Sequence, residues 1–484
     1  MFQKIKKALF EKNTLSVIFW FSVLGFLRPA LNVFLLPLYL NHLTPEDFGI
    51  LSLIGVFTGI ILGIGNLRLD TAMRVFYFDY NHSSKELHHY LRQLFSTVLI
   101  LALLWFSFFV IAGPWFFQLI FANEKVLFFP YGIIALTTGL LGMVNAIYFI
   151  YLKNQVKIRA FFTYSVSSTI LTVILQAIFV LKFEMKVEGV LLGYLIPTVL
   201  VFMFIVFSNR WIITRMLDAK ILKQSILFSL PLIPFTFLMT LEKQLDKFFL
   251  EKYQSLEIVG LYAVLISLVG IASILLAALN NGIRPYLYQA LKDNTPESHE
   301  QINHYFLIYI ATGILGLGGI VFLGNNLNLI TDNVKYLQVQ PYFILAAIGA
   351  VPMVFVQYFA LIYIYYKKSN SLLIITFVKT LVMIIFLWWL IPKYGITGAI
   401  AGIALSYLMN AIIFYKQVGS LSDVRVNYIA GFKMVIVFLI VTIGCNYLLS
   451  PISVNLFGLI QFLIISVCIL WMSRNHLKHL LSLR

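Results

Sequence analysis

Several charged side chains interrupt long apolar runs, and these are the residues that could do chemistry. Arg28 stands at the middle of the run from Thr14 to Leu40. A charged side chain at the centre of a membrane span costs about 2.5–3.5 kcal/mol on insertion scales. Such a residue is kept where it faces a water-filled cavity or pairs with an acidic partner. Arg28 is therefore either half of a structural ion pair or an anion-binding residue at mid-membrane.

Three further cations lie within an apolar run or at its end, where the two arginines would line the inner mouth of a cleft. Arg68 closes the second run together with Asp70 and Arg74, Arg284 precedes Pro285 at the end of the eighth, and Lys379 lies nine residues into the eleventh. Planar guanidinium groups suit the bidentate binding of phosphate or pyrophosphate. We therefore predict an anion site that uses Arg28, Arg68, Arg284 and Lys379. Anchoring at the membrane surface is the alternative for the arginines, and pairing with a carboxylate is the alternative for Lys379.

Carboxylates at membrane depth form a second set. Glu242 and Asp246 stand four residues apart, which places them on one face of a continuous helix, with Lys243 and Lys247 on the neighbouring face. Such carboxylates could exchange a proton or Na⁺, with the lysines tuning their pKa. Extension of these side chains to the outer membrane interface is the alternative. We predict that Asp70, Glu242 and Asp246 serve in ion coupling or gating.

Three prolines are predicted hinges. Pro231 and Pro234 fall within four residues of one apolar run, and Pro352 lies in a later one. Proline removes a helical hydrogen bond, so the pair is expected to break or kink its helix and to free carbonyl groups that line a cavity or a hinge.

The composition identifies the elements that carry these residues as membrane helices. The 484-residue chain is 61% hydrophobic and 11% charged, and its mean hydropathy is +0.93. A helix needs about 20 apolar residues to span a bilayer, and about fourteen runs of that kind predict an all-α integral membrane protein. The runs lie near residues 14–41, 48–66, 93–121, 126–151, 160–181, 187–208, 225–250, 257–283, 303–324, 338–366, 371–391, 396–415, 429–449 and 452–472.

The net charge of +16 reports topology. With an even number of spans and a cytoplasmic N-terminus, most of the 35 Lys and Arg residues fall on the cytoplasmic side. We therefore expect both termini in the cytoplasm and no binding of nucleic acid.

The chain contains an internal repeat, in which single matches are weak but share nearly the same offset. Arg68 matches Arg284, His89-Tyr90 matches His304-Tyr305, and Gly189 matches Gly398, at offsets from 209 to 216 residues. The matches predict two six-helix lobes in parallel orientation, residues 1–218 and 219–419, followed by two additional helices in 420–484. Parallel repeats of this kind are typical of transporters, with the substrate site near the midplane where the repeats meet.

Other activities lack their sequence signals. No Walker A sequence occurs, so any active transport is expected to be secondary and driven by an H⁺ or Na⁺ gradient. The two cysteines have no histidine in ligand spacing, so we expect no metal and no other cofactor. Gly313, Gly316, Gly318 and Gly319 indicate close helix contact in an apolar span. Loops are too short for a glycan polymerase or ligase, and we expect no enzymatic activity.

Three segments carry a family resemblance. Leu-Pro37-Leu-Tyr-Leu followed by Leu-Thr-Pro-Glu-Asp-Phe-Gly49, Asp246-Lys-Phe-Phe-Leu followed by Val-Gly260-Leu-Tyr, and Tyr394-Gly-Ile-Thr-Gly398-Ala-Ile-Ala-Gly402 resemble the polysaccharide-biosynthesis branch of the multidrug/oligosaccharidyl-lipid/polysaccharide (MOP) exporter superfamily. That branch includes the O-antigen (Wzx-type) flippases. Related lipid II flippases also place an arginine in the first-helix region where Arg28 stands.

The resemblance implies a V of two six-helix lobes around a cationic cavity in the bacterial inner membrane. The cargo would be an oligosaccharide on undecaprenyl pyrophosphate, as in O-antigen and lipopolysaccharide assembly, moved from the inner to the outer leaflet by alternating access. A glycan polymerase and a chain-length regulator are implied partners. A drug or organic-cation antiporter of the MATE type is the nearest alternative, and acidic residues in the cavity of the N-terminal lobe would distinguish it. A lipid II-type flippase is the other.

Overall fold

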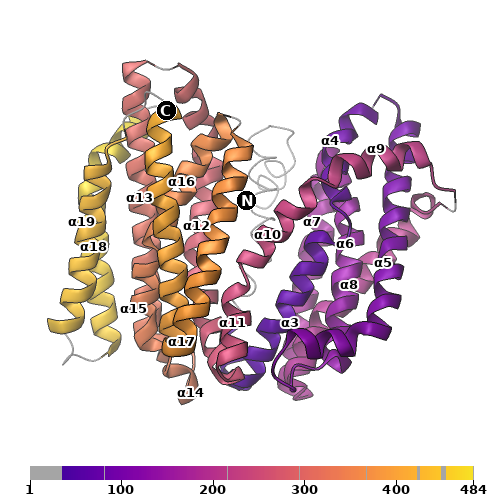
Figure 1. Cartoon of the computed structure of the whole chain (residues 1–484), viewed down its shortest axis with the longest axis horizontal. Helices are drawn as coiled ribbons and strands as arrows, with labels where there is room; N and C mark the ends of the chain where they lie inside the picture. The colour runs from indigo at the N-terminus through magenta and orange to yellow at the C-terminus, as the bar shows by residue number, and fades with distance from the viewer. Residues whose placement is uncertain are drawn as a thin grey trace, which may run out of the picture. The chain divides into compact units, whose positions relative to one another are not determined.

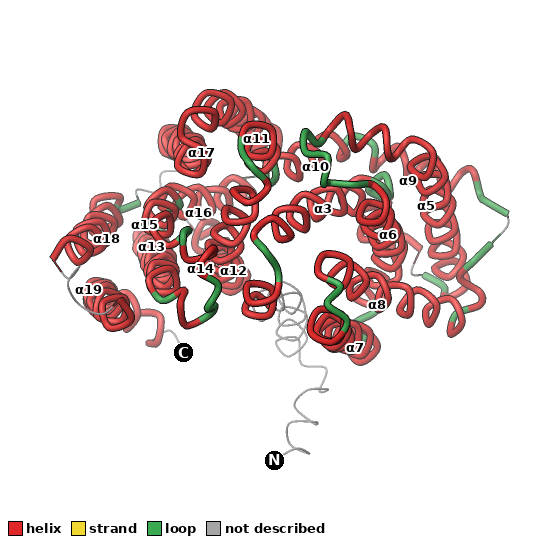
Figure 2. Tube along the Cα trace, turned by 90° about the horizontal axis from the view of Figure 1, so that it is seen from below, coloured by secondary structure: helices red, strands yellow, loops and turns green. Residues whose placement is uncertain are grey.

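The computed structural model describes residues 35–80, 82–214, 216–293, 295–366, 368–421, 426–448 and 454–482. Throughout these ranges the regular secondary structure is helical, as Figure 2 shows by colour. The chain divides into two compact units, Met1–Lys252 and Tyr253–Arg484. The predicted division into residues 1–218, 219–419 and 420–484, and the repeat behind it, stay predictions.

The first unit is a set of packed helices labelled in Figure 1. Helical residues 35–42 precede them. The elements are α3 (Pro45–Ile64), α4 (Leu69–Tyr80), α5 (Ser84–Ile120), η1 (Phe128–Gly132), α6 (Ile133–Asn154), α7 (Ile158–Ala177), η2 (Ile178–Lys182), α8 (Lys186–Ser208), η3 (Arg210–Ile212), α9 (Ala219–Ser229), α10 (Leu232–Glu242) and α11 (Leu245–Tyr253).

The sequence itself defines the start of α3. The Thr44 hydroxyl accepts a hydrogen bond from the Asp47 backbone N–H at 3.2 Å, and the Asp47 carboxylate accepts one from the Thr44 backbone N–H at 3.0 Å. Pro45 occupies the first helical position, where its missing N–H costs nothing. This reciprocal cap ends the preceding turn and starts the helix directly after Thr44.

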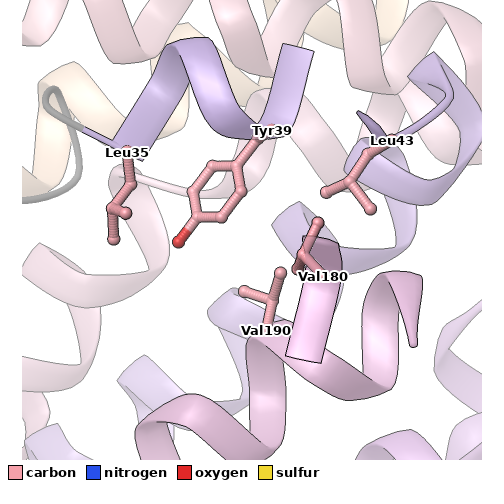
Figure 3. Close-up of a cluster of buried hydrophobic side chains, with 5 residues drawn as sticks. All are labelled: Leu35, Tyr39, Leu43, Val180 and Val190. Atoms are coloured by element: carbon pink, nitrogen blue, oxygen red, sulfur yellow. The ribbon is translucent and has the colours of Figure 1, made fainter. Parts of the chain in front are cut away.

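A buried cluster joins the helix of residues 35–42 to η2 and α8. Leu35, Tyr39 and Leu43 pack with Val180 and Val190, as Figure 3 shows. The Tyr39 hydroxyl donates a 2.7 Å hydrogen bond to Gln176 Oε1, so its one polar atom is satisfied inside the apolar cluster.

The second unit contains longer helices. They are α12 (Leu256–Asp293), α13 (Pro296–Asn325), η4 (Leu327–Leu329), α14 (Val334–Leu337), α15 (Gln340–Gly349), α16 (Val351–Tyr365), α17 (Ser369–Leu421), α18 (Tyr428–Leu448) and α19 (Val454–Ser482). The last two pack against α13, and the Asn325 side chain donates a 2.9 Å hydrogen bond to Gln461 Oε1 there.

The glycines of α13 permit close helix contact, as predicted. A methyl group on Gly313 would clash with the Val354 side chain of α16, and one on Gly316 would lie 3.4 Å from Ala272 Cβ of α12. Glycine at these positions lets neighbouring helices approach α13.

Helix α17 is two helical arms separated at Gly395. This residue has φ of +52°, a left-handed conformation that glycine adopts without steric cost. A Cβ at Gly402 would lie 3.5 Å from the Phe386 carbonyl carbon, so the two arms run side by side. The predicted runs 371–391 and 396–415 are these arms.

Ten helices among the described residues are long and apolar enough to cross a membrane, or eleven if the bent pair α9–α10 is one span. The chain is therefore a multi-pass membrane protein. Three parts of the chain account for the difference between these spans and the fourteen predicted ones. The run 14–41 begins outside the described residues, α17 contains two predicted runs, and only Gly458–Arg474 of the last run is described as an apolar segment. The number fourteen stays a prediction.

Candidate functional site

The connection from α3 to α4 has an unusual backbone conformation. Leu67 and Arg68 have φ of +51° and +60°, in the left-handed region that side chains other than glycine rarely adopt. The buried Asn66 stabilises it, because its Oδ1 accepts a 2.9 Å hydrogen bond from the Arg68 backbone N–H. This turn places the Arg68 side chain beside the first turn of α4.

Asp70 lies beside two arginines. Arg68 Nη1 lies 3.6 Å from Asp70 Oδ1, and Arg74 Nη2 lies 3.7 Å from Asp70 Oδ2. The Thr71 hydroxyl accepts a 2.7 Å hydrogen bond from Arg68 Nη2. Arg74 is mostly exposed, whereas the side chains of Arg68 and Asp70 are 25% and 10% exposed. The cluster has an excess of one positive charge, so it can attract an anion while the carboxylate holds the guanidinium groups in place.

Arg68 retains hydrogen-bonding capacity. Among the described residues, neither Arg68 Nε nor Asp70 Oδ1 has a hydrogen-bond partner, although both atoms are buried. Buried polar groups are normally hydrogen-bonded, so a ligand or water is the expected partner. Arg68 therefore has an N–H group that an anion could use, and its role as an anion ligand stays a prediction.

Helix α9 covers this region. The buried Ser229 hydroxyl donates a 3.0 Å hydrogen bond to the Arg68 carbonyl oxygen. Ser225 and Tyr90 share a 3.2 Å hydrogen bond, and the Tyr90 ring stacks on Tyr80 with centroids 4.4 Å apart. These supporting residues, and Asn66 as well, were not predicted from the sequence. Only Asn66 gives a sequence signal, because asparagine is frequent in turns with left-handed residues.

The segment with Glu242 and Asp246 is not one continuous helix, which corrects the assumption behind their shared face. Helix α10 ends at Glu242, a turn follows at Lys243 and Gln244, and α11 begins at Leu245. Both carboxylate residues are buried, at 9% and 4% exposure. The Asp246 carboxylate accepts a 2.9 Å hydrogen bond from the Lys247 backbone N–H. Their role in ion coupling stays a prediction.

The prolines mark two interruptions. Helices α9 and α10 meet at Leu230 and Pro231 with a bend of 49°, so the predicted break in this run is confirmed. Pro234 lies in the first turn of α10. Pro352 lies in the first turn of α16, after the break that separates α15 from α16. Movement at these hinges stays a prediction.

Lys379 and Arg284 lie in the second unit. Lys379 is 7% exposed, and its Nζ lies 4.3 Å from the centroid of the Tyr407 ring on the other arm of α17. Arg284 is exposed on α12. Arg28 lies outside the described residues. The combination of Arg28, Arg68, Arg284 and Lys379 in one anion site stays a prediction.

Metal ligands do not cluster in the described part of the chain. No group of three or more His, Cys, Asp or Glu side chains there is placed to hold a metal ion. Cys445 and Cys468 are free thiols on α18 and α19.

Comparison with solved structures identifies the fold. The protein titled "Lipid II flippase MurJ, inward closed conformation" matches with a TM-score of 0.70 and 16% identity, over 95% of this chain and 99% of that one. An inward-facing MATE-family multidrug-resistance transporter of the MOP superfamily matches with a TM-score of 0.67 and 15% identity, over 81% and 95%. A MOP-superfamily transporter from Pyrococcus furiosus, whose title reports reversed polarity of its binding pocket, matches with a TM-score of 0.56 and 16% identity, over 84% and 96%.

Sequence comparison gives the family. A search of curated proteins found no match. The model of the family described as "Polysaccharide biosynthesis protein" matches residues 15–291, which is more than half of the chain. The chain has the fold of the MOP-superfamily transporters and belongs to the polysaccharide biosynthesis protein family.

Proposed function

We propose that the protein is a secondary transporter that flips undecaprenyl-pyrophosphate-linked oligosaccharide units of O-antigen or a similar surface polysaccharide. It moves them from the inner to the outer leaflet of the bacterial inner membrane by alternating access. It acts as a carrier and catalyses no chemical step. Both termini lie in the cytoplasm.

The family match carries the proposal, and the fold, which resembles that of a structure titled a lipid II flippase, supports it. The family is named for polysaccharide biosynthesis, and the MurJ structure, titled a lipid II flippase, covers 95% of this chain. The MATE structure covers 81%, so the flippase accounts for more of the chain. The excess positive charge around Arg68 and Asp70 adds support, because it suits an anionic pyrophosphate.

The physical problem fits this type of carrier. A sugar–pyrophosphate headgroup cannot cross hydrocarbon unaided, because its charges and hydroxyl groups would lose their hydration. The polyprenyl tail has no such barrier and can stay in lipid. The protein therefore needs a polar, cationic path for the headgroup alone, with Arg28, Arg68, Arg284 and Lys379 as the proposed pyrophosphate contacts.

In this proposal the two six-helix lobes rock against each other, and this movement opens the substrate site alternately to the two sides of the membrane. Pro231, Pro234 and Pro352 are the proposed hinges, and the observed 49° bend at Pro231 supports the first. An H⁺ or Na⁺ gradient supplies the energy through Asp70, Glu242 or Asp246. The glycan polymerase and the chain-length regulator are proposed partners that receive the product.

A MATE-type antiporter of drugs or organic cations is the second candidate, favoured by the structural match to such a transporter. The arginines around Asp70 argue against it, because an excess of positive charge repels a cationic substrate. A lipid II-type flippase differs from the main proposal only in its cargo.

The first test is on Arg28. Arg28→Ala and Arg28→Lys are expressed in a strain that lacks its own flippase, and surface glycan is scored against the amount of protein in the membrane. We expect Ala to abolish glycan at normal abundance and Lys to restore it in part. Normal export by both variants would remove Arg28 from the site and redirect the search to Arg68, Arg284 and Lys379.

The ion-coupling hypothesis needs a separate assay. Asp70→Asn, Glu242→Gln and Asp246→Asn are reconstituted in liposomes, and gradient-driven uptake is measured. At least one variant is expected to lose the dependence on the gradient. Full retention in all three would dismiss these carboxylates as the coupling groups.

A further inference from the structure

A basic pocket lies at the start of α5. Its volume is about 530 Å³, and it is lined by Ser84, Lys85, His88, His89, Arg92 and Trp211. Lys85, His88, His89 and Arg92 follow at spacings of three and four, so these side chains form one stripe along a single face of the helix. Trp211 comes from η3, far along the chain.

Contacts within the first unit hold this stripe in place. The rings of His88 and Trp211 lie with centroids 4.1 Å apart, and His88 Nε2 lies 3.2 Å from the Tyr151 hydroxyl. Arg92 Nη2 lies 3.2 Å from His89 Nδ1. The imidazole, indole and guanidinium groups are therefore held in place by contacts within the protein, so the basic pocket is preorganised.

The charge of the pocket is positive. Lys85 and Arg92 supply basic side chains, and no carboxylate is among the residues that line the pocket. The carboxylate of Asp218 lies 3.7 Å from His89 Nε2, but Asp218 is not among the residues that line the pocket. Buried Arg92 Nε has no hydrogen-bond partner among the described residues. An anion with several acceptor oxygens would satisfy both cations and that N–H group.

The position on the helix indicates the depth in the membrane. Further along α5, Leu103, Leu104 and Ile111 are 59%, 62% and 84% exposed, as expected for side chains that face lipid tails. Arg92 precedes Leu103 by eleven residues, which is roughly 16 Å at 1.5 Å per residue. This spacing is close to half the thickness of a bilayer's hydrocarbon core, which is about 30 Å. With the exposed leucines among the lipid tails, the stripe and Trp211 therefore lie near the headgroups, where lysine, arginine and tryptophan are common.

We propose that this pocket binds the phosphate of an anionic phospholipid headgroup. Lys85 and Arg92 contact the phosphate oxygens, and Trp211 packs against the glycerol region. A free phosphate ion shares this chemistry, but the depth of the pocket along α5 favours the lipid. The site is distinct from the Arg68–Asp70 cluster, and the inference does not depend on which cargo the protein carries.

The test measures lipid binding to the purified full-length protein. Phosphatidylglycerol is titrated into detergent-solubilised protein, and bound lipid is counted by native mass spectrometry. The variant is Lys85→Gln/Arg92→Gln. The matched control is Lys220→Gln/Lys223→Gln, which removes the same charge from exposed positions of α9 that do not line the pocket.

The expected result is specific to the pocket. Each basic side chain that contacts the headgroup is expected to lower the Kd about fivefold. Loss of both should therefore raise the Kd of the tightest phosphatidylglycerol site about 30-fold in the double variant. The control should stay within about twofold of the wild type. Lys85→Gln alone should raise the Kd about fivefold. Because the Lys85 side chain is exposed, this single variant should fold normally, and it tests the pocket even if the double variant misfolds.

Three outcomes would overturn the proposal. Unchanged affinity in the folded double variant, or in Lys85→Gln, would show that the pocket does not bind the lipid. Equal binding of phosphatidylcholine would remove the preference for an anionic headgroup. Displacement of the lipid by inorganic phosphate at equal concentration would identify a site for free phosphate instead.

Discussion

The Arg68 guanidinium and the Asp70 carboxylate lie 3.6 Å apart at the start of α4, and the Arg74 guanidinium approaches the same carboxylate at 3.7 Å. The Asp70 carboxylate is 10% exposed, so a neighbouring guanidinium is needed to offset the loss of its hydration, and the partly buried Arg68 is the main partner. Asp70 therefore has a structural role as the counter-charge of Arg68.

Asp70→Asn should destabilise the protein by about 1–3 kcal/mol, because it leaves the partly buried Arg68 without its counter-charge. Arg74→Gln should cost less than about 1 kcal/mol, since that side chain is exposed. Thermal unfolding in detergent measures both. The double variant Arg68→Gln/Asp70→Asn should lose less stability than the sum of the losses in the two single variants. Strictly additive losses would contradict direct coupling of the two charges.

The left-handed conformation of Arg68 predicts an unusual order of variants. Arg68→Gly should be more stable than Arg68→Ala by about 1 kcal/mol, because glycine adopts φ of +60° without a Cβ penalty. Both variants remove the guanidinium, so their difference isolates the backbone. Both are compared by thermal unfolding, and an Ala variant at least as stable as the Gly variant would argue against this turn conformation.

Local signals in the sequence predicted local structure well. Thr44 and Pro45 define the start of α3, and Pro231 coincides with the bend before α10, because each acts on hydrogen bonds within a single turn. The position of the α13 glycines in an apolar run predicted close helix contact, and Gly313 and Gly316 confirm it.

Features that depend on distant segments were not predictable. No proline or glycine marks the break after Glu242, and nothing in the sequence around Arg68 shows that α9 covers it. The hydrogen bond from Ser229 to the Arg68 carbonyl joins residues 161 positions apart, so only tertiary packing reveals it. The candidate site was therefore predicted as a set of charged residues without the groups that position them.

Gly313 provides a test of helix packing. Gly313→Ala should destabilise the second unit by about 1–3 kcal/mol, because the new methyl group meets the stiff β-branched side chain of Val354. Gly270→Ala is the matched control, since no atom lies within 4 Å of the new methyl group in α12. The control should be neutral or stabilising by up to about 1 kcal/mol. Equal effects of the two substitutions on thermal unfolding would refute the close contact.

Asp218 predicts a pH dependence at the start of α9. Its carboxylate accepts hydrogen bonds from the backbone N–H groups of Ile221 and Lys220, at 3.3 and 2.9 Å. These bonds, with His89 nearby, lower the pKa of the Asp218 carboxyl from its usual value. A carboxyl with a lowered pKa contributes stability above its unfolded pKa and loses it as the pH falls through the folded value.

Asp218→Ala should therefore be less stable than the wild type near neutral pH, and the difference should shrink below about pH 4. Asp218→Asn keeps an acceptor for the cap but cannot ionise, so it should lie close to the wild type at low pH. Thermal unfolding is followed from about pH 7 to pH 3. A difference between wild type and Ala variant that does not vary with pH would contradict the role of the ionised carboxylate.

Lys379 and Tyr407 predict coupling across the two arms of α17. A buried ammonium 4.3 Å from the centre of an aromatic ring gains about 0.5–2 kcal/mol from the ring's negative face. In a double-mutant cycle of Lys379→Met and Tyr407→Leu, thermal unfolding should show a coupling free energy of that size. The same variants, scored for surface glycan at matched abundance, separate two roles. Lys379→Met should lose export while Tyr407→Leu retains it if the ammonium contacts cargo, whereas equal export by both would make the lysine a packing residue.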